Sequence, residues 1–308
     1  MRTLIIGSGF IGRAVGAGIA ARGGGAVLAS RNRVPLPESG PGGLTWTALD
    51  ATDPGDCARV VEASGADTVL LVHGPSDVTW CEANPAEALA THEVAAVNAA
   101  RAAAGRRTVL ISTDNVFDGT AAVNDESAAV RPANAYGTAK LRAEEALLSH
   151  ASDATVLRVS LVYGWEPAES AKWLNFFSAC AHALAAGREF HVPEDQWTTP
   201  VLVDDVAEVT RAVLRGPAPE LLHLGGPDRI SRADWARLIA EETGGDPRLV
   251  RAVRRAASRY ASRPENTCLT STLLPHLAAT AAVRPRGVRE AARGLIRLAG
   301  QAAANPDR

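Results

Sequence analysis

Residues 3–12 read Thr-Leu-Ile-Ile-Gly-Ser-Gly-Phe-Ile-Gly, and this stretch decides how the rest of the chain is interpreted. The first four residues predict a short strand with no polar face, as in the centre of a parallel sheet. A Gly-x-Gly-x-x-Gly turn follows, and then a helical pattern to Arg22. In this order of elements the glycines allow a tight turn, a close approach of a pyrophosphate to the backbone, and close helix–strand packing. We therefore expect a dinucleotide cofactor to bind at the start of this helix, at Gly7, Gly9, Phe10, Ile11 and Gly12. The alternative is a glycine-rich turn with a structural role only.

Apolar runs and helical patterns alternate through the first half of the chain. Further strands are predicted at Ala26–Ser30, Leu44–Thr47, Asp67–Val72, Thr108–Ser112 and Ala154–Val159. Beyond residue 160 the alternation stops, and a helix is expected at about 169–186. The pattern predicts an α/β fold with a Rossmann-type doubly wound parallel sheet. We expect residues 1–160 to bind the cofactor, and residues 161–308 to form a smaller, partly interleaved domain that mainly binds substrate.

The ends of the other strands supply more candidate cofactor contacts. The second strand ends in Ser30-Arg31-Asn32-Arg33, without the acidic residue that usually bonds the ribose of NAD. Arg31 or Arg33 would suit a 2′-phosphate, so NADP(H) is favoured over NAD(H), although both could be solvated loop residues. Asp50 and Ala51 follow the third strand, where Asp50 could bond the adenine. His73 and Gly74 follow the fourth strand, at the edge where such folds bind ligands.

A hydroxyl, a phenol and an amine form the candidate catalytic set. Thr113 ends a strand, and Tyr136 and Lys140 are four residues apart, on one face of a predicted helix. An unperturbed tyrosine has a pKa near ~10, so we expect the ammonium of Lys140 to lower the pKa of the phenol. This combination suits hydride exchange at a carbonyl or alcohol, with Tyr136 as the proton carrier.

Composition excludes several classes of function. Lys and Arg number 32 and Asp and Glu 34, a net charge of −2 without blocks of like charge, so neither nucleic acid nor an anionic membrane is an expected partner. No apolar run reaches ~18 residues, so no membrane span is expected. The four cysteines are widely scattered, which favours free thiols in a reducing cytosol and argues against a metal site. Abundant Arg and Ala indicate a GC-rich, bacterial genome.

Several motifs together resemble a known family, the extended short-chain dehydrogenase/reductases, and specifically the dTDP-4-dehydrorhamnose reductase branch. The stretches that carry the resemblance are residues 7–12, 111–119, 136–140, 157–164, 195–200 and 263–266. The resemblance implies that Thr113 bonds the substrate carbonyl and that Tyr136 delivers the proton. It also implies that Lys140 bonds the nicotinamide ribose and holds the pKa of the tyrosine down. In addition it makes Asp114, Asn115, Leu161, Trp165, Gln196 and Arg263 candidate substrate contacts.

Two departures from the branch bear on the substrate. Asn115 stands where the branch has a tyrosine, and Leu161 stands where it has a tryptophan of the sugar pocket. The related 4,6-dehydratases carry an acidic residue at the position of Asn115, so reduction is expected rather than loss of water. Asp114 could be catalytic or could cap a turn, and Arg158 and Arg263 could bind a phosphate or form ion pairs.

The expected function is NAD(P)H-dependent reduction of a keto group, most readily on a nucleotide-activated deoxysugar in a bacterial glycan or secondary-metabolite pathway. One alternative is a reductase or dehydrogenase of a small metabolite without the nucleotide. Another is a non-catalytic, NADP-binding partner that resembles the regulatory subunit of methionine adenosyltransferase. A homodimer is compatible with the resemblance, although no residue requires one.

Overall fold

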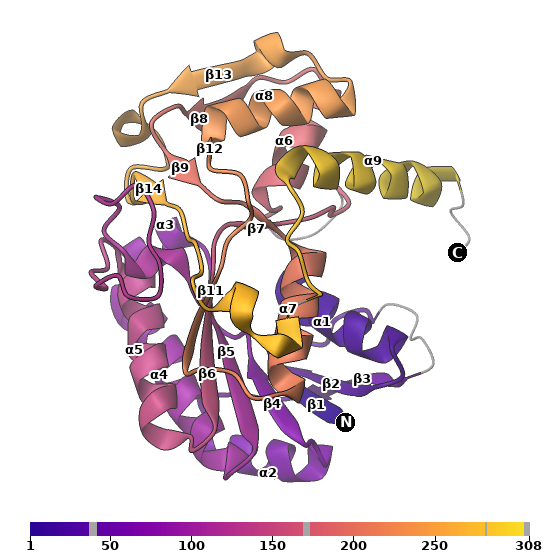
Figure 1. Cartoon of the computed structure of the whole chain (residues 1–308), viewed down its shortest axis with the longest axis vertical. Helices are drawn as coiled ribbons and strands as arrows, with labels where there is room; N and C mark the ends of the chain where they lie inside the picture. The colour runs from indigo at the N-terminus through magenta and orange to yellow at the C-terminus, as the bar shows by residue number, and fades with distance from the viewer. Residues whose placement is uncertain (37–41, 169–172, 281, 305–308) are drawn as a thin grey trace.

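A seven-stranded sheet forms the centre of the larger part of the molecule (Figure 1). The structure is a computed structural model, and it describes residues 1–36, 42–168, 173–280 and 282–304. The strand order is β11-β6-β5-β4-β1-β2-β3, and every neighbouring pair is parallel. The strands are β1 Arg2–Ile6, β2 Gly25–Ser30, β3 Leu44–Ala48, β4 Thr68–Leu71, β5 Arg107–Thr113, β6 Ala154–Val159 and β11 Leu221–Leu224. The order reverses at β1 and β4, as in dinucleotide-binding folds, and the predicted doubly wound sheet is confirmed.

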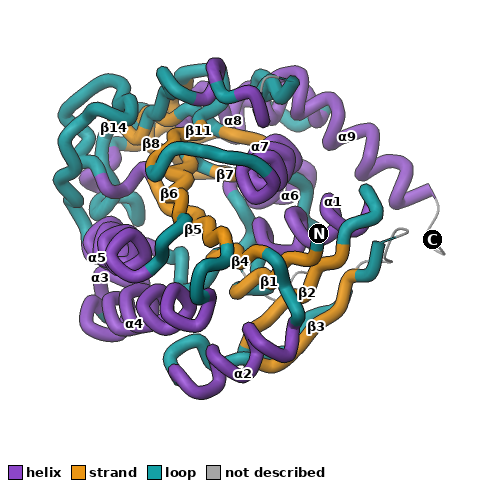
Figure 2. The backbone as a smooth tube through the Cα atoms, turned by 60° about the horizontal axis from the view of Figure 1, so that its bottom comes forward, coloured by secondary structure: helices purple, strands orange, loops and turns teal. Residues whose placement is uncertain are grey.

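Helices cover both faces of the sheet because its central strands are apolar on both sides (Figure 2). One face packs against α1 (Phe10–Ala21) and α7 (Val203–Arg215), through residues such as Val15 and Val209. The other face packs against α2 (Pro54–Ser64), α4 (Pro85–Ala103) and α5 (Ala135–His150). The carboxyl ends of the strands are left between these layers and the second half of the chain.

The second half builds its own apolar core, with Trp235 and Phe177 fully buried. Its helices are α6 (Phe176–Ala185), α8 (Arg232–Thr243) and α9 (Val288–Ala304). Its short strands are β7 Val162–Tyr163, β8 Phe190–Pro193, β9 Trp197–Thr198, β10 Val201–Leu202, β12 Ile230–Ser231, β13 Val250–Val253 and β14 Asn266–Thr267. In Figure 1 the pair β8–β13 and α8 lie at the end of the molecule opposite the main sheet. The helix α7 and the strand β11 come from this half of the chain but belong to the main sheet and its cover.

Two local differences from the predicted elements have clear causes. The helix expected at about 169–186 begins only at Phe176, because the Asn175 side chain accepts hydrogen bonds from the N–H groups of Phe177 and Ser178 at 3.1 and 3.3 Å. Residues 169–172 of that prediction lie outside the described residues. A short helix that was not predicted, α3 (Val78–Ala83), follows β4.

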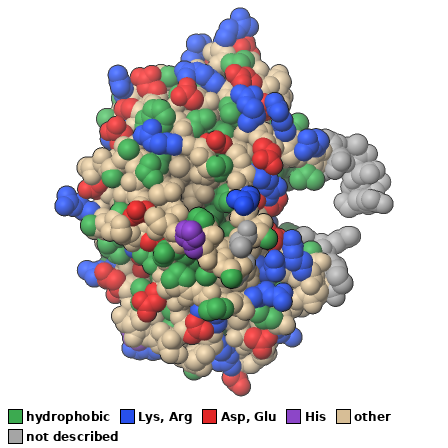
Figure 3. All heavy atoms as spheres, viewed as in Figure 1, with side chains coloured by type: hydrophobic (Ala, Val, Ile, Leu, Met, Phe, Trp, Pro, Cys, Tyr) green, Lys and Arg blue, Asp and Glu red, His purple; other side chains and the backbone are tan. Residues whose placement is uncertain are grey.

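Charged side chains of both signs are interspersed on the face seen in Figure 3. Within the described part of the chain, no helix combines the length and the apolar character that crossing a membrane requires. All four cysteines are buried and free.

Candidate active site

The three candidate catalytic side chains meet where β5 ends and α5 begins. Thr113 is the last residue of β5, and Tyr136 and Lys140 lie in the first two turns of α5. The helix starts here because the side chain of Asn134 caps it, accepting a hydrogen bond from the N–H of Gly137 at 2.8 Å. The Thr113 hydroxyl is a hydrogen-bonding partner of the Tyr136 phenol and acts to lower its pKa. The structure therefore brings together the alcohol and the phenol that the sequence places 23 residues apart.

The pKa of Tyr136 differs from the expectation. Burial, and then the charge of Asp114, raise the pKa of this phenol above its usual value, and the hydrogen bond of Thr113 only partly opposes them. The prediction that Lys140 lowers this pKa is wrong for the protein without ligands. Its ammonium instead donates a hydrogen bond to the carbonyl of Ile111 at 2.6 Å. A neutral, protonated phenol is the form that can give up a proton.

Lys140 is almost completely buried, with 3 % of its surface exposed. Burial lowers the pKa of the Lys140 ammonium to about 8, and the charge of Glu144 opposes this shift. The lysine is therefore a buried cation held by the backbone of β5.

Asp114 and Asn115 form a hydrogen-bonded network next to Thr113. The Asp114 carboxylate accepts hydrogen bonds from the amide of Asn115 at 2.8 Å and from the hydroxyl of Ser160 at 3.2 Å. Burial raises the pKa of Asp114 to about 6, against the effect of these hydrogen bonds. The carbonyl oxygen of the Asn115 side chain accepts a hydrogen bond from Asn134 at 3.0 Å. The Asn115 amide is thus engaged on both sides by protein groups, which is not the arrangement that a free substrate contact predicts.

The glycine turn between β1 and α1 has the shape that a dinucleotide needs. A Cβ atom on Gly12 would lie 2.1 Å from the carbonyl oxygen of Gly7, so only glycine allows this helix to pack against the turn. A Cβ on Gly9 would meet nothing within 4 Å, which leaves open space at the helix start. No side chain caps α1, and Phe10 and Ile11 form its first turn. These residues fit the pyrophosphate of a dinucleotide.

The end of β2 gives a mixed outcome for the predicted contacts. The Ser30 hydroxyl accepts hydrogen bonds from Ser8 at 2.7 Å and from the Trp46 indole at 2.9 Å, and it donates to the carbonyl of Asn32 at 2.8 Å. Ser30 therefore holds the turn together through its side chain. Arg31 and Arg33 are both exposed.

Candidate contacts also lie at the ends of β3 and β4. The carboxylate of Asp50 is exposed, and hydrogen bonds from Thr52, followed by the weaker effect of Arg31, lower its pKa. The carbonyl of Ala51 accepts a hydrogen bond from Asn98 at 3.1 Å.

Two buried histidines, His73 after β4 and His92 on α4, lie with their ring centres 5.8 Å apart. His73 Nε2 lies 3.0 Å from the carbonyl of His92, and Nδ1 of His73 is buried without a protein partner. Because burial lowers the pKa of His73 to about 4, this ring is neutral at pH 7 and its Nδ1 can accept a hydrogen bond from a ligand. The His92 ring packs against Gly74, where a Cβ would lie 2.2 Å away, and lies 5.9 Å from the Tyr136 ring.

The remaining candidate substrate contacts lie on the second half of the chain. Leu161 and Trp165 pack against its core. Gln196 is buried; its amide donates to the carbonyl of Pro264 at 3.3 Å, and its side-chain oxygen has no protein partner. Arg263 donates to the carbonyl of Arg259 at 2.8 Å.

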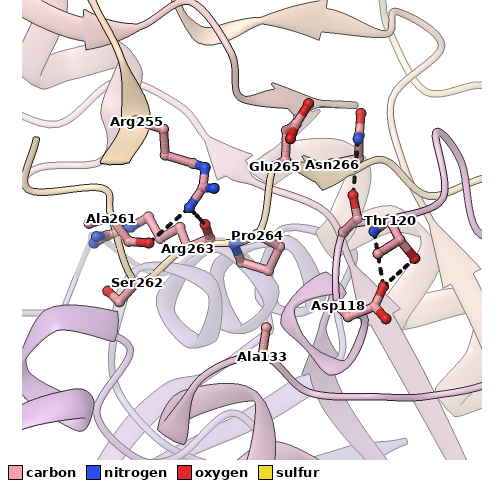
Figure 4. Close-up of a pocket in the computed structure, with 11 residues that line it drawn as sticks. Asp118, Thr120, Ala133, Arg255, Ala261, Ser262, Arg263, Pro264, Glu265 and Asn266 are labelled. Carbon is pink, nitrogen blue, oxygen red and sulfur yellow. Dashed lines mark hydrogen bonds between the residues drawn. The ribbon is translucent and has the colours of Figure 1, made fainter. Parts of the chain in front are cut away.

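Arg263 borders a cavity of about 340 Å³ between the loops at 118–120 and 255–266 (Figure 4). In Figure 4, Arg255 closes the loop at 261–263 by donating to two of its carbonyls. Thr113 caps the short helical turn that ends at Val116. Asp118, two residues further along the chain, lines the cavity.

Arg158, Asn134 and Ser160 have structural roles that the sequence did not reveal. Arg158 forms a buried ion pair with Glu144 at 2.6 Å, so the phosphate-binding alternative for it is wrong. Asn134 and Ser160 were not singled out, although an asparagine two residues before the tyrosine is a helix-start signal. Within the described residues, no group of three or more His, Cys, Asp or Glu side chains could hold a metal ion.

Known proteins resemble this chain in sequence and in fold. The sequence model of a family described as RmlD substrate binding domain matches residues 1–298. The probable low-salt glycan biosynthesis reductase Agl14 of Haloferax volcanii is 31 % identical over 225 residues, which are 72 % of this chain and 75 % of that protein. The dTDP-4-dehydrorhamnose reductase of Mycobacterium tuberculosis is 33 % identical over 241 residues, 74 % of this chain and 76 % of that protein. A dTDP-4-dehydrorhamnose reductase from Bacillus anthracis, solved in complex with NADP, superimposes with a TM-score of 0.79 at 20 % identity, over 96 % of this chain and 99 % of that one.

Proposed function

Because the chain belongs to the RmlD substrate binding domain family, we propose that it reduces a keto group of a nucleotide-activated deoxysugar with a nicotinamide cofactor. The observation that carries the proposal is the meeting of Thr113 and Tyr136 above Lys140, at the carboxyl edge of a sheet whose first turn fits a pyrophosphate. The names of the two relatives, both reductases and one of them acting on a dTDP-sugar, support the substrate class.

Thr113, Tyr136 and Lys140 have separate roles in the proposed reaction. When bound, the reduced cofactor supplies the hydride. The Thr113 hydroxyl orients the substrate oxygen, and the Tyr136 phenol donates the proton to it as the negative charge develops. The raised pKa of Tyr136 suits a donor that must stay protonated until that moment. Lys140, which is buried on the same helix as Tyr136, would bind the ribose hydroxyls of the cofactor.

We propose NADP(H) as the preferred cofactor, with residues 1–160 as its main binding unit and residues 161–308 as the main substrate unit. The end of β2 carries no carboxylate, and Arg31 and Arg33 are exposed there and available to a 2′-phosphate. Candidate contacts of the cofactor also include His73, whose Nδ1 has no protein partner. The four free, buried cysteines favour a reducing bacterial cytosol. The proposal also places the enzyme in a secondary-metabolite or glycan pathway, and it takes the protein to be a homodimer.

The test is the variant Tyr136→Phe. We expect NADPH oxidation in the presence of a dTDP-4-keto-6-deoxysugar to fall by about 100-fold or more, because the proton donor is lost. NADPH binding, measured by fluorescence, should stay within about twofold, since cofactor contacts are not removed. Tyr163→Phe is the matched control, because the Tyr163 hydroxyl is buried in the second core without a partner. A Tyr136→Phe enzyme with near wild-type turnover contradicts the mechanism.

The same assay separates the alternatives. Turnover of simple keto compounds, but not of dTDP-keto sugars, would indicate a small-metabolite reductase. Absence of turnover on any carbonyl, together with co-purification of an adenosyltransferase, would indicate a non-catalytic partner. The presence of Thr113, Tyr136 and Lys140 in one place favours catalysis.

A further inference from the structure

A buried arginine without an acidic partner lies in the second half of the molecule. Arg232 is the first residue of α8, and 7 % of its surface is exposed. Among the described residues, no carboxylate lies within ion-pair distance of its guanidinium, and its Nε has no hydrogen-bond partner. A largely buried charge that lacks a counter-ion is costly. Arg158, the other arginine buried to this extent among the described residues, is paired with Glu144.

Aromatic rings and further arginines surround Arg232. Its guanidinium lies 4.8 Å from the centre of the Phe176 ring and 5.4 Å from that of Tyr260. The guanidinium groups of Arg259 and Arg263 each lie 5.1 Å from the same Tyr260 ring. The rings partly offset the burial of one cation, but three guanidinium groups around one ring repel one another. The cluster therefore favours binding of an anion.

The cluster is connected to the candidate active site. The N–H of Arg232 donates to the carbonyl of Gln196 at 2.9 Å, and the adjacent strand pair β9–β12 carries Thr198. The Thr198 hydroxyl lies 3.1 Å from that of Ser160, which bonds Asp114 at 3.2 Å. Asp114 is also the carboxylate whose charge reaches Arg232 and raises the pKa of its guanidinium, against a larger lowering by burial. Arg263 in turn borders the cavity of Figure 4, which gives the cluster a route to solvent.

On the basis of the proposed function, we infer that Arg232, with Arg259 and Arg263, binds an oxyanion of the substrate, with Arg232 as the buried anchor. A planar guanidinium binds phosphate and carboxylate with the same paired hydrogen bonds. The diphosphate of the nucleotide and a carboxylate on the sugar are the two sources of this anion. In either case the inference narrows the substrate class to one that carries the anion within reach of the carbonyl site.

The experiment measures binding without turnover, by calorimetry on the NADP-loaded full-length protein. The probes are dTDP and thymidine, which differ in the diphosphate, and UDP-glucuronic acid and UDP-glucose, which differ in the carboxylate. For Arg232→Met we expect affinity for dTDP to fall about tenfold or more while that for thymidine is unchanged, because charged hydrogen bonds are lost. If affinity for dTDP is instead unchanged and the preference for UDP-glucuronic acid over UDP-glucose disappears, the inference also holds, with the sugar carboxylate as the anion.

Arg237→Gln is the matched control, because Arg237 is on the same helix, is more exposed and bonds Asp234 on the surface. The midpoint of thermal unfolding without ligand is a second readout, and we expect Arg232→Met to keep or raise it, because an unpaired buried charge is removed. If Arg232→Met fails to fold, Arg232→Lys keeps the charge but lacks the planar fork, and it should also bind the anion more weakly. Equal affinities of wild type and variant for all four probes would overturn the inference alone. Failure of the wild type to bind any of the probes would overturn the nucleotide-sugar proposal along with it.

Discussion

At the scale of single residues, Asn115 has a role that its neighbours define. Its side-chain amide donates to Asp114 at 2.8 Å, and its side-chain oxygen accepts from Asn134 at 3.0 Å. Asn134 caps the helix that carries Tyr136. Asn115 therefore connects the turn after Thr113 to the start of the catalytic helix, and we interpret it as a positioning residue.

A double-mutant cycle tests this connection. We expect Asn115→Ala to lower kcat for keto-sugar reduction about fivefold, because a hydrogen bond of about 1 kcal/mol that orients the tyrosine is lost. Asn134→Ala should lower kcat and also destabilise α5, since it removes the helix cap. In the double variant the two losses should not add, because they break the same bond. Strict additivity in kcat, measured with saturating NADPH, would show that the bond between the two side chains does not matter.

The sequence predicts the roles that depend on order and spacing, but not those that depend on the folded environment. Thr113, Tyr136 and Lys140 were predicted because their order and spacing are visible in the sequence. The upward shift of the Tyr136 pKa was not predicted, because burial and the charge of Asp114 depend on the folded environment. Arg232 was missed for the same reason: Phe176 and Tyr260, which surround it, lie 56 and 28 residues away in the sequence.

At the scale of elements, the contact between β1 and α1 distinguishes a glycine that packing requires from one that is only a candidate cofactor contact. Gly12 lies against the carbonyl of Gly7, where an added Cβ would be 2.1 Å away, whereas an added Cβ on Gly9 meets nothing within 4 Å. The backbone of Gly9, with φ −71° and ψ −167°, is also one that alanine adopts without strain. The space beside Gly9 is therefore free in the protein without ligands.

This difference predicts opposite effects of two similar substitutions. Gly9→Ala should leave the free energy of unfolding within about 0.5 kcal/mol of wild type, because nothing clashes. It should weaken NADPH binding about tenfold or more, since the methyl group occupies the place of the pyrophosphate. Gly12→Ala should instead destabilise the fold by about 2 kcal/mol or more, because α1 must move away from β1. Urea unfolding and NADPH titration check both; a Gly9→Ala protein that binds NADPH normally would argue against a pyrophosphate at this turn.

The bounds of helices and strands were predicted correctly where local sequence signals determine them. The strand at 154–159 was predicted at its observed bounds. The start of α6 was not predicted correctly. The helical pattern extends to residues before Asn175, but the Asn175 side chain caps the helix there. The short helix α3 was also missed, since six residues are too few to show a period.

At the scale of the whole molecule, the second half of the chain completes the first. Strand β11 forms the edge of the main sheet beside β6, and helix α7 covers one face of that sheet. Val206, Val209 and Val213 of α7 are each completely buried there. The sequence predicted this interleaving only in outline, because pairing of β11 with β6 joins residues about 65 positions apart.

A fragment of residues 1–160 is therefore not expected to fold, although it contains the glycine turn and all three candidate catalytic side chains. Without α7 it loses the burial of three valines, each worth about 1.5 to 3 kcal/mol. That sum is comparable to the whole stability of a typical domain, about 5 to 15 kcal/mol, and the missing β11 adds an unpaired sheet edge. We expect the fragment to show no cooperative thermal transition by circular dichroism and to bind a hydrophobic dye, whereas the full chain unfolds cooperatively. A fragment that unfolds cooperatively and binds NADPH would show that residues 1–160 are an independent domain, and that α7 and β11 only add to a sheet already stable without them.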